Sequence, residues 1–231
     1  MSTTDLNNWT PPPLPPRVAL KGRYAALEPL SDDHVLGLRE AHSEDATGAM
    51  WTYLPVGPFN DAGYAEWVAD NRILRDPLHY AIRMADDRLG GTISLLRINP
   101  QAGSIETGWL TFAPRLQRTR EATEAVYLLM TWAFDAGYRR FEWKCNARNR
   151  ASRRAAERYG LSYEGIFRQA SVVKGRNRDT AWFAAIDGEW PALRTAFETW
   201  LDPANFDADG RQKTRLADLT APILATRDPA L

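Results

Sequence analysis

The chain has 231 residues and a mass of 26.1 kDa, which suits one globular domain with extensions at its ends. Hydrophobic residues make up 44% and charged residues 25%, so a wholly disordered chain is excluded. Lys and Arg together number 29, as do Asp and Glu, which argues against nucleic acid or an acidic membrane as the main partner. The one cysteine, Cys145, excludes an internal disulfide framework or a cysteine-rich zinc site.

Neither end of the sequence reads as a membrane or secretion signal. No apolar run approaches the roughly 20 residues of a membrane span, and the polar start lacks a basic and an apolar region. We therefore expect a soluble cytoplasmic protein that binds no membrane. Residues 1–17 include the run Pro-Pro-Pro-Leu-Pro-Pro, typical of an extended arm. Residues 202–231 have weak apolar periodicity, so we expect an irregular tail or a segment that packs on a partner, such as a second copy in a homodimer.

Between these extensions, residues 18–201 alternate between strand-like and helix-like periods. An extended segment (18–29) precedes two helices, one capped by Ser31 and one over 61–74. Three alternating segments (80–84, 91–98 and 105–112) then predict an antiparallel meander. A long helix (121–136), a strand (141–145), a helix (149–160), two strands (162–173 and 180–186) and a final helix near 193–201 follow. This order predicts an α+β domain with a central, mostly antiparallel sheet flanked by helices.

The junction between the meander and the long helix carries the first functional signal, in residues 111–124. A strand that leads into a helix N-terminus directs unpaired amides and the positive end of the helix dipole at one point, which favours a phosphate. Arg115, Arg118 and Arg120 add positive charge there. A basic turn without any ligand is the alternative.

This junction resembles the phosphate-binding motif of the Gcn5-related N-acetyltransferase (GNAT) family. Residues 112–114, Phe-Ala-Pro, stand where that family has Val-x-Pro, and residues 117–122, Gln-Arg-Thr-Arg-Glu-Ala, match its Gln/Arg-x-x-Gly-x-Gly/Ala loop at both ends. Arg120 stands in place of the middle glycine of that loop. A glycine there would permit an unusual backbone conformation.

A second segment, residues 146–165, resembles the Asn-x-x-Ser…Gly-Phe…Glu-Gly pattern of the branch with the ribosomal-protein N-terminal acetyltransferases. The matching positions are Asn149, Ser152, Gly160, Glu164 and Gly165, with Leu161 in place of phenylalanine. The resemblance implies a GNAT-like acyl-CoA N-acyltransferase fold, acetyl-CoA as cosubstrate and an amine as acceptor. It implies coenzyme contacts from Phe112, Gln117, Arg118, Thr119, Arg120, Glu121, Ala122, Thr123, Asn149 and Ser152.

Three residues are candidates for the proton transfers of acetyl transfer. Many family members have a tyrosine four residues before the motif glycine, where this chain has Ala156. The resemblance therefore makes Ser152 the donor to the coenzyme's sulfur. The alternative is that Ser152 only supports the first turn of its helix. The attacking amine must lose a proton, and Glu106, on the strand that should part beside the acetyl group, is the leading base. Asp179 is the second candidate. A solvated strand glutamate and a turn-stabilising aspartate are the alternatives.

Several further residues define the acceptor side and the competing functions. Trp51, Tyr53 and Trp109 could form an aromatic wall for the acceptor, or belong to the core. Ser171 stands where some ribosomal-branch enzymes have an acid, which leaves the acceptor open between a protein N-terminus and a small molecule. The histidines lack metal-ligand spacing, so we expect no metal. A non-catalytic acyl-CoA sensor and, less favoured, an RNA-binding module are the alternative functions.

Overall fold

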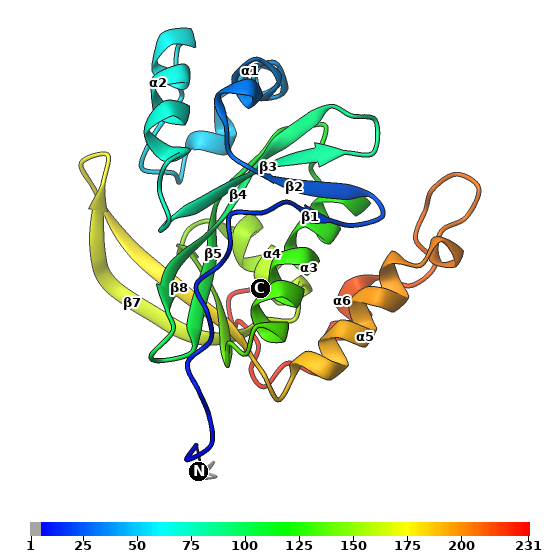
Figure 1. Ribbon diagram of the computed structural model, residues 1–231. Helices are drawn as coiled ribbons and strands as arrows, with labels where there is room; N and C mark the ends of the chain where they lie inside the picture. The colour runs from blue at the N-terminus through cyan, green and yellow to red at the C-terminus, as the bar shows by residue number, and fades with distance from the viewer. Residues whose placement is uncertain (1–5) are drawn as a thin grey trace.

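An eight-stranded sheet in the order β1-β2-β3-β4-β5-β6-β8-β7 forms the centre of the computed structural model, which describes residues 6–231 (Figure 1). Every neighbouring pair is antiparallel except β5 and β6, which are parallel. The predicted mostly antiparallel α+β fold is therefore confirmed. The strands are β1 (Leu20–Lys21), β2 (Ala25–Pro29), β3 (Leu78–Met84), β4 (Leu89–Asn99), β5 (Ser104–Phe112), β6 (Arg140–Asn146), β7 (Ser162–Val173) and β8 (Arg176–Ile186).

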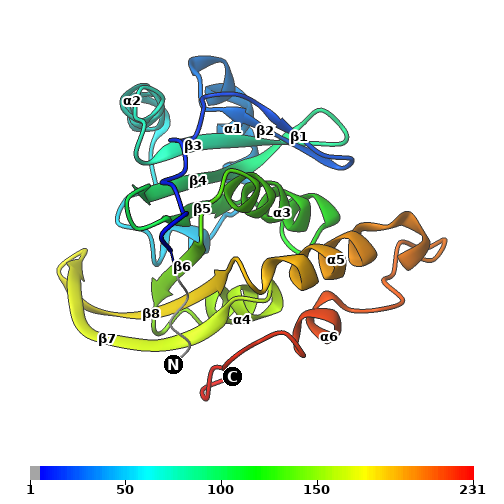
Figure 2. The ribbon, with the colours of Figure 1, turned by 60° about the horizontal axis from the view of Figure 1, so that its bottom comes forward.

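Helices cover the two faces of this sheet unequally. Along β3, Tyr80 and Ile82 pack into the large core with α3, whereas Ala81 between them packs against α1 and α2, so the helices lie on opposite faces. Figure 2 shows α3 beside α5, with α4 and α6 next to them. The α-helices are α1 (Val35–Ser43), α2 (Asp61–Asn71), α3 (Arg120–Asp135), α4 (Arg150–Arg158), α5 (Trp190–Leu201) and α6 (Leu216–Thr220). Short 3-10 turns cover Asp32–His34, Ala49–Trp51 and Pro203–Asn205.

The long helix α3 begins where its sequence predicts. The hydroxyl of Thr119 accepts a hydrogen bond from the Ala122 amide, which caps the first turn. Its buried face continues through Val126, Leu129 and Ala133, at the spacing of a helix packed on a sheet. Glu124 on the same helix is buried and accepts the amides of Arg23, Tyr24 and Ala25 at 2.6–2.8 Å. This carboxylate therefore fixes the β1–β2 turn to the start of the long helix.

The structure differs from the sequence-based elements at three places. The extended segment 18–29 is a hairpin of β1 and β2, because the chain reverses at residues 22–24. The second helix ends at Asn71 rather than 74, and Ile73 beyond its end is 68% exposed. The tail was expected to be irregular or to meet a partner; it contains α6 and packs on its own domain.

Both extensions are held by the body of the protein. In the described part of the N-terminal arm, the carbonyl of Pro13 accepts from the Tyr138 hydroxyl at 3.0 Å. At the other end Asp228, fully buried, forms a two-bond ion pair with Arg153 of α4 at 2.5 and 2.6 Å. The Arg153 side chain is 7% exposed, so its charge is taken up by this internal pair. No helix within residues 6–231 is long and apolar enough to cross a membrane.

Asp228→Asn should destabilise the protein because Arg153 would keep its charge while buried without a counterion. We expect a loss of about 3 kcal/mol in the free energy of unfolding, measured by urea titration. Asp209→Asn is the matched control, because Asp209 pairs with Arg211 at an exposed site. An equal effect of the two substitutions would contradict the buried pair.

Candidate functional site

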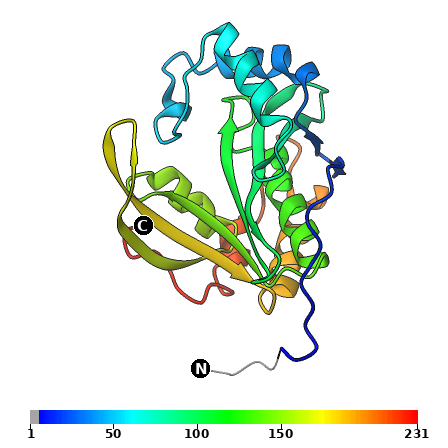
Figure 3. The same cartoon turned by 60° about the vertical axis from the view of Figure 1, so that its left-hand side comes forward.

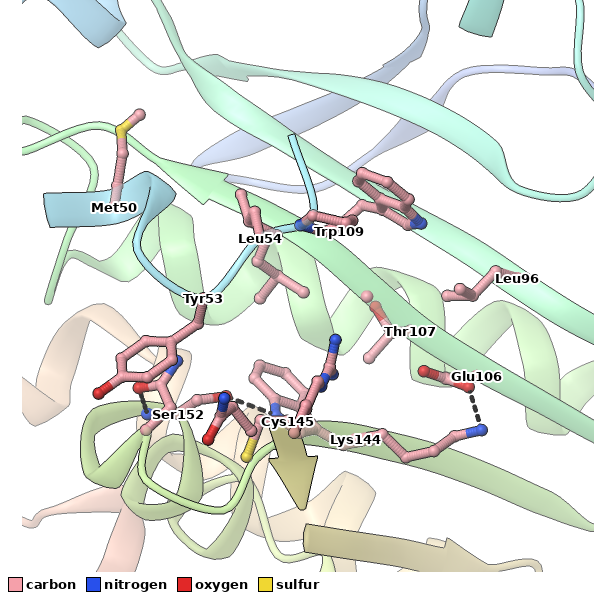
Figure 4. A pocket seen from close by; sticks show the side chains of 17 residues that line it. Met50, Tyr53, Leu54, Leu96, Glu106, Thr107, Trp109, Lys144, Cys145 and Ser152 are labelled. Atoms are coloured by element: carbon pink, nitrogen blue, oxygen red, sulfur yellow. Dashed lines mark hydrogen bonds and ion pairs between the residues drawn. The ribbon is translucent and has the colours of Figure 1, made fainter. Parts of the chain in front are cut away.

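A cavity lies where strands β5 and β6 part. They pair from Ser104 and Arg140 as far as Thr107 and Trp143, and then diverge. Beyond this point β5 carries a bulge against β4, with Trp109 at a φ of 53°. The opening holds a cavity of about 260 Å³, shown in Figure 4. The strand break and the bulge together create space at the centre of the sheet.

The cavity connects the two faces of the sheet. On β6, Trp143 and Cys145 belong to the core that packs against α3, whereas Lys144 between them faces the opposite side. On β5, Ile105 belongs to that same core, so Glu106 lies on the face of Lys144. The cavity is lined by side chains from both faces of the sheet: Glu106 and Lys144 on one face, and Trp143 and Cys145 on the other. A thioester entering from the α3 and α4 side could meet an amine from the other side.

Glu106 lies buried in this cavity with charged neighbours. Its Oε2 is 2.5 Å from Lys144 Nζ and 3.3 Å from Arg97 Nε. The residue is 6% exposed, and this burial raises the pKa of its carboxyl from 4.5 to about 7, although the positive charge of Lys144 acts in the opposite direction. Lys144 also lies 3.9 Å from the centre of the Trp182 ring. A carboxyl with this pKa can exchange a proton near neutral pH, as a general base must.

Ser152 lies at the opposite end of the cavity, at the start of α4. The side chain of Asn149 caps that helix by accepting from the Ser152 amide at 3.0 Å. The Ser152 hydroxyl accepts from Trp143 Nε1 at 2.9 Å. An indole nitrogen only donates, so the serine's own proton is left for an acceptor, and the neighbouring Cys145 sulfur is one acceptor within its reach. Cys145 beside it is buried, which raises the pKa of its thiol to about 11 and keeps it protonated.

The loop between β5 and α3 presents backbone amides with no internal partner. Hydrogen bonds within the loop satisfy several neighbouring amides, whereas those of Arg118, Arg120 and Glu121 have no acceptor in residues 6–231. They lie at the positive end of the 16-residue helix α3. Arg118, with a φ of 65°, is the loop residue in the left-handed conformation; Arg120 already belongs to the helix. The glycine missing at position 120 is therefore not required for a positive φ.

Several side chains predicted to contact the coenzyme are already in contact with other groups of the protein. Gln117 folds back, and its side chain donates to the Phe112 carbonyl at 2.8 Å. The Arg120 guanidinium lies between the rings of Tyr24 and Phe206, 4.9 and 4.6 Å from their centres. Ala122 and Thr123 are buried, and Thr123 accepts from Arg158 of α4. Arg115, which the sequence placed with the phosphate charges, is paired with Glu40 and Glu44 instead.

The predicted acceptor residues also separate. Tyr53 and Trp109 line the cavity, whereas Trp51 is buried between His42 and Phe59 and lines a different hollow near α1 and α2. Ser171 is exposed on β7 and does not line the cavity.

Asp179, the second candidate base, does not line the cavity either. Its carboxylate accepts from the Gln169 amide at 2.7 Å and from Asn177, and these bonds lower its pKa, which makes it a weak base. These contacts favour the alternative role for Asp179, stabilisation of the turn in the β7–β8 hairpin.

Sequence reasoning missed Lys144, Asn146 and Arg178, which also line the cavity. The alternation along β6 offered a signal for Lys144, because the apolar Phe141, Trp143 and Cys145 assign it to the face opposite the core. Arg178 had no comparable signal, since only the β6–β8 pairing brings its strand to the cavity. In residues 6–231, no group of three or more His, Cys, Asp or Glu could hold a metal ion.

Comparisons with known proteins agree with this arrangement. The acetyltransferase (GNAT) domain family matches residues 26–162. A GCN5-related N-acetyltransferase from Brucella melitensis has 45% identity and a TM-score of 0.91, covering 94% of this chain and 100% of its own. A probable GNAT-family acetyltransferase from Chromobacterium violaceum has 40% identity and a TM-score of 0.77, covering 83% and 98%.

A more distant structural neighbour is RimL, the ribosomal L7/L12 α-N-protein acetyltransferase, in complex with coenzyme A. It has 22% identity and a TM-score of 0.62, covering 73% of this chain and 97% of its own, which shows a shared fold. No curated protein matches. The chain belongs to the GNAT acetyltransferase family, as the two motifs indicated.

Lys144→Met should raise the pKa of the Glu106 carboxyl above about 7, because the lysine's charge stabilises the ionised form. Titration of ¹³C-labelled glutamate carboxyls by NMR, with Glu106→Gln to assign the signal, measures this directly. Lys213→Met is the control, since Lys213 only donates to the distant Ala204 carbonyl. An unchanged or lowered pKa would show that the ion pair does not govern Glu106.

Proposed function

We propose that this protein is an acetyl-CoA-dependent N-acetyltransferase that transfers acetyl to an amine by direct attack in a ternary complex. The observation that carries the proposal is the cavity that passes between β5 and β6. Its α4 end presents Ser152, and its other end presents the buried carboxyl of Glu106. A thioester and an amine could therefore approach one another from opposite faces of the sheet.

The coenzyme's diphosphate is best accommodated at the N-terminus of α3. The free amides of Arg118, Arg120 and Glu121 can donate to phosphate oxygens, and the helix dipole adds positive potential. The Arg118 side chain is exposed and adds a charge at the same point. The GNAT family as a whole uses acetyl-CoA, which supports this choice of ligand.

The side chains lining the cavity can serve both proton transfers. Glu106 accepts the proton that the amine loses as its nitrogen attacks the thioester carbonyl. The carbon–sulfur bond then breaks, and the Ser152 hydroxyl is placed to donate to the departing sulfur. Residues 108–112 of β5 have no β6 partner, so amides along this free edge can polarise the carbonyl. The protonated Cys145 thiol favours direct attack over a covalent enzyme intermediate.

Glu106→Gln should lower kcat about 100-fold or more, because it removes the base but preserves the shape of the side chain. In the unsubstituted enzyme kcat/KM should rise with pH as the Glu106 carboxyl ionises around pH 7, and the variant should lose this rise. Asp179→Asn is the matched control, as that carboxylate lies outside the cavity. The assignment of the base fails if Asp179→Asn has the larger effect.

Arg118→Glu should weaken coenzyme A binding at least tenfold, because a negative charge would face the diphosphate. Calorimetry with coenzyme A and with pantetheine, which lacks the diphosphate, separates this effect from general damage: the affinity for pantetheine should change little. Arg75→Glu, at an exposed position before β3, is the control. Binding of coenzyme A without transfer to any amine in a broad panel would favour the acyl-CoA sensor instead.

A further inference from the structure

The β7–β8 hairpin is positively charged although the whole chain is neutral. Residues 165–179 contain four cationic side chains and one acidic one, a net charge of three. Figure 3 shows this hairpin approaching the segment between α1 and α2 across the open face of the sheet. Its Lys174 donates to the carbonyls of Trp51 and Gly57 at 3.0 and 2.8 Å. The hairpin is therefore anchored beside the acceptor side of the cavity.

One hairpin side chain, Arg178, reaches the cavity itself. It alternates with Thr180 and Trp182 along β8, and Trp182 pairs directly with Lys144 of β6. Paired and alternating residues project from the same face, so Arg178 lies on the face of Glu106 and Lys144. Its Nε is buried, yet has no hydrogen-bond partner, and the guanidinium forms no ion pair with any residue of the described chain.

The nearby acidic groups are already engaged. Glu106 faces both Lys144 and Arg97. Asp179, next to Arg178 in sequence, receives the Gln169 amide and the Asn177 side chain instead. A buried donor without a partner is costly, and an ionised one more so. The guanidinium of Arg178 can therefore bind an anionic group of a ligand in this cavity.

We propose that the acceptor amine carries an anionic group, a carboxylate or a phosphate, that binds Arg178 while its nitrogen faces Glu106. This inference rests on the proposed function. Trp182 pairs with Lys144, and Arg178 lies four residues beyond Trp182 along β8, whereas Glu106 pairs with Glu142 on the other side of Lys144. The anion therefore sits several bonds from the nitrogen. A small amino acid with a spaced carboxylate and a peptide N-terminus followed by acidic residues share this chemistry.

We assign the anion to the acceptor rather than to the coenzyme because Arg178 and the proposed diphosphate site lie on opposite faces of the sheet. The free amides at the start of α3 belong to the helix-covered face, whereas Arg178 lies on the opposite face. A guanidinium in this setting forms charge-assisted hydrogen bonds with a carboxylate or phosphate, stronger than those between neutral groups. Arg178 would then act as a residue that determines acceptor specificity.

Two matched probe pairs test the proposal with the full-length enzyme and acetyl-CoA. The first compares 5-aminopentanoate with pentylamine, and the second compares the peptide Ser-Glu-Glu-Ala with Ser-Gln-Gln-Ala, each amidated at its C-terminus. The anionic member of at least one pair should have a kcat/KM at least tenfold higher than its neutral partner. Whichever pair shows this preference identifies the source as a small molecule or a peptide.

Arg178→Gln should reduce that ratio to near one, and Arg178→Glu should invert it. Arg176→Gln, an exposed change on the same hairpin, should preserve it. Equal rates within both pairs for the unsubstituted enzyme would overturn the inference while leaving the proposed function intact. A tenfold loss of coenzyme A affinity in Arg178→Gln would also overturn it, by assigning Arg178 to the coenzyme. Failure to acetylate any amine would instead overturn the proposed function.

Discussion

The parting of β5 and β6 after Thr107 and Trp143 is the constraint on which the site depends. A continuous parallel pair would bring these strands within about 5 Å of each other and close the sheet at this point. Instead β5 carries a bulge at Trp109 against β4, and the edges of β5 and β6 that no longer pair become the walls of a cavity. Core packing against α3 on one face leaves the other face of β5 and β6 free for polar side chains.

Glu106 is buried by the same geometry that makes it useful. Its position on β5 places it beside Lys144, because both strands are still paired there and their side chains share a face. Burial favours the neutral carboxyl and the nearby cations favour the ionised one, so its pKa comes to about 7 rather than to either extreme. The structural anchor Glu124 differs, since three backbone amides satisfy its carboxylate. One buried glutamate thus lines the cavity, whereas the other anchors a turn to a helix.

Much of the fold could be predicted from the sequence because the apolar period is strong in α3 and in the β3–β5 meander. Glu106 and Ser152 could also be placed, since strand alternation and a helix cap fix where each points. Arg178 could not, because its approach to the cavity depends on the pairing of strands separated in sequence by more than 30 residues. The tail was unpredictable for a related reason: Asp228 is polar in sequence, and only its buried partner Arg153 explains its place.

Net charge was the least informative property of this sequence for the site. A net charge of zero argues against binding of polyanions through the overall electrostatic field of the protein. It does not describe single regions, whose local charges differ. Two arginines of α4 illustrate this: Arg153 is neutralised by Asp228 of the tail, and Arg158 rests against Trp200 and Thr123. The cavity holds the reverse case, where Arg178 has no counterion among residues 6–231 although the chain has as many acidic as basic residues. Local compensation, residue by residue, therefore decides which cations can act on a ligand.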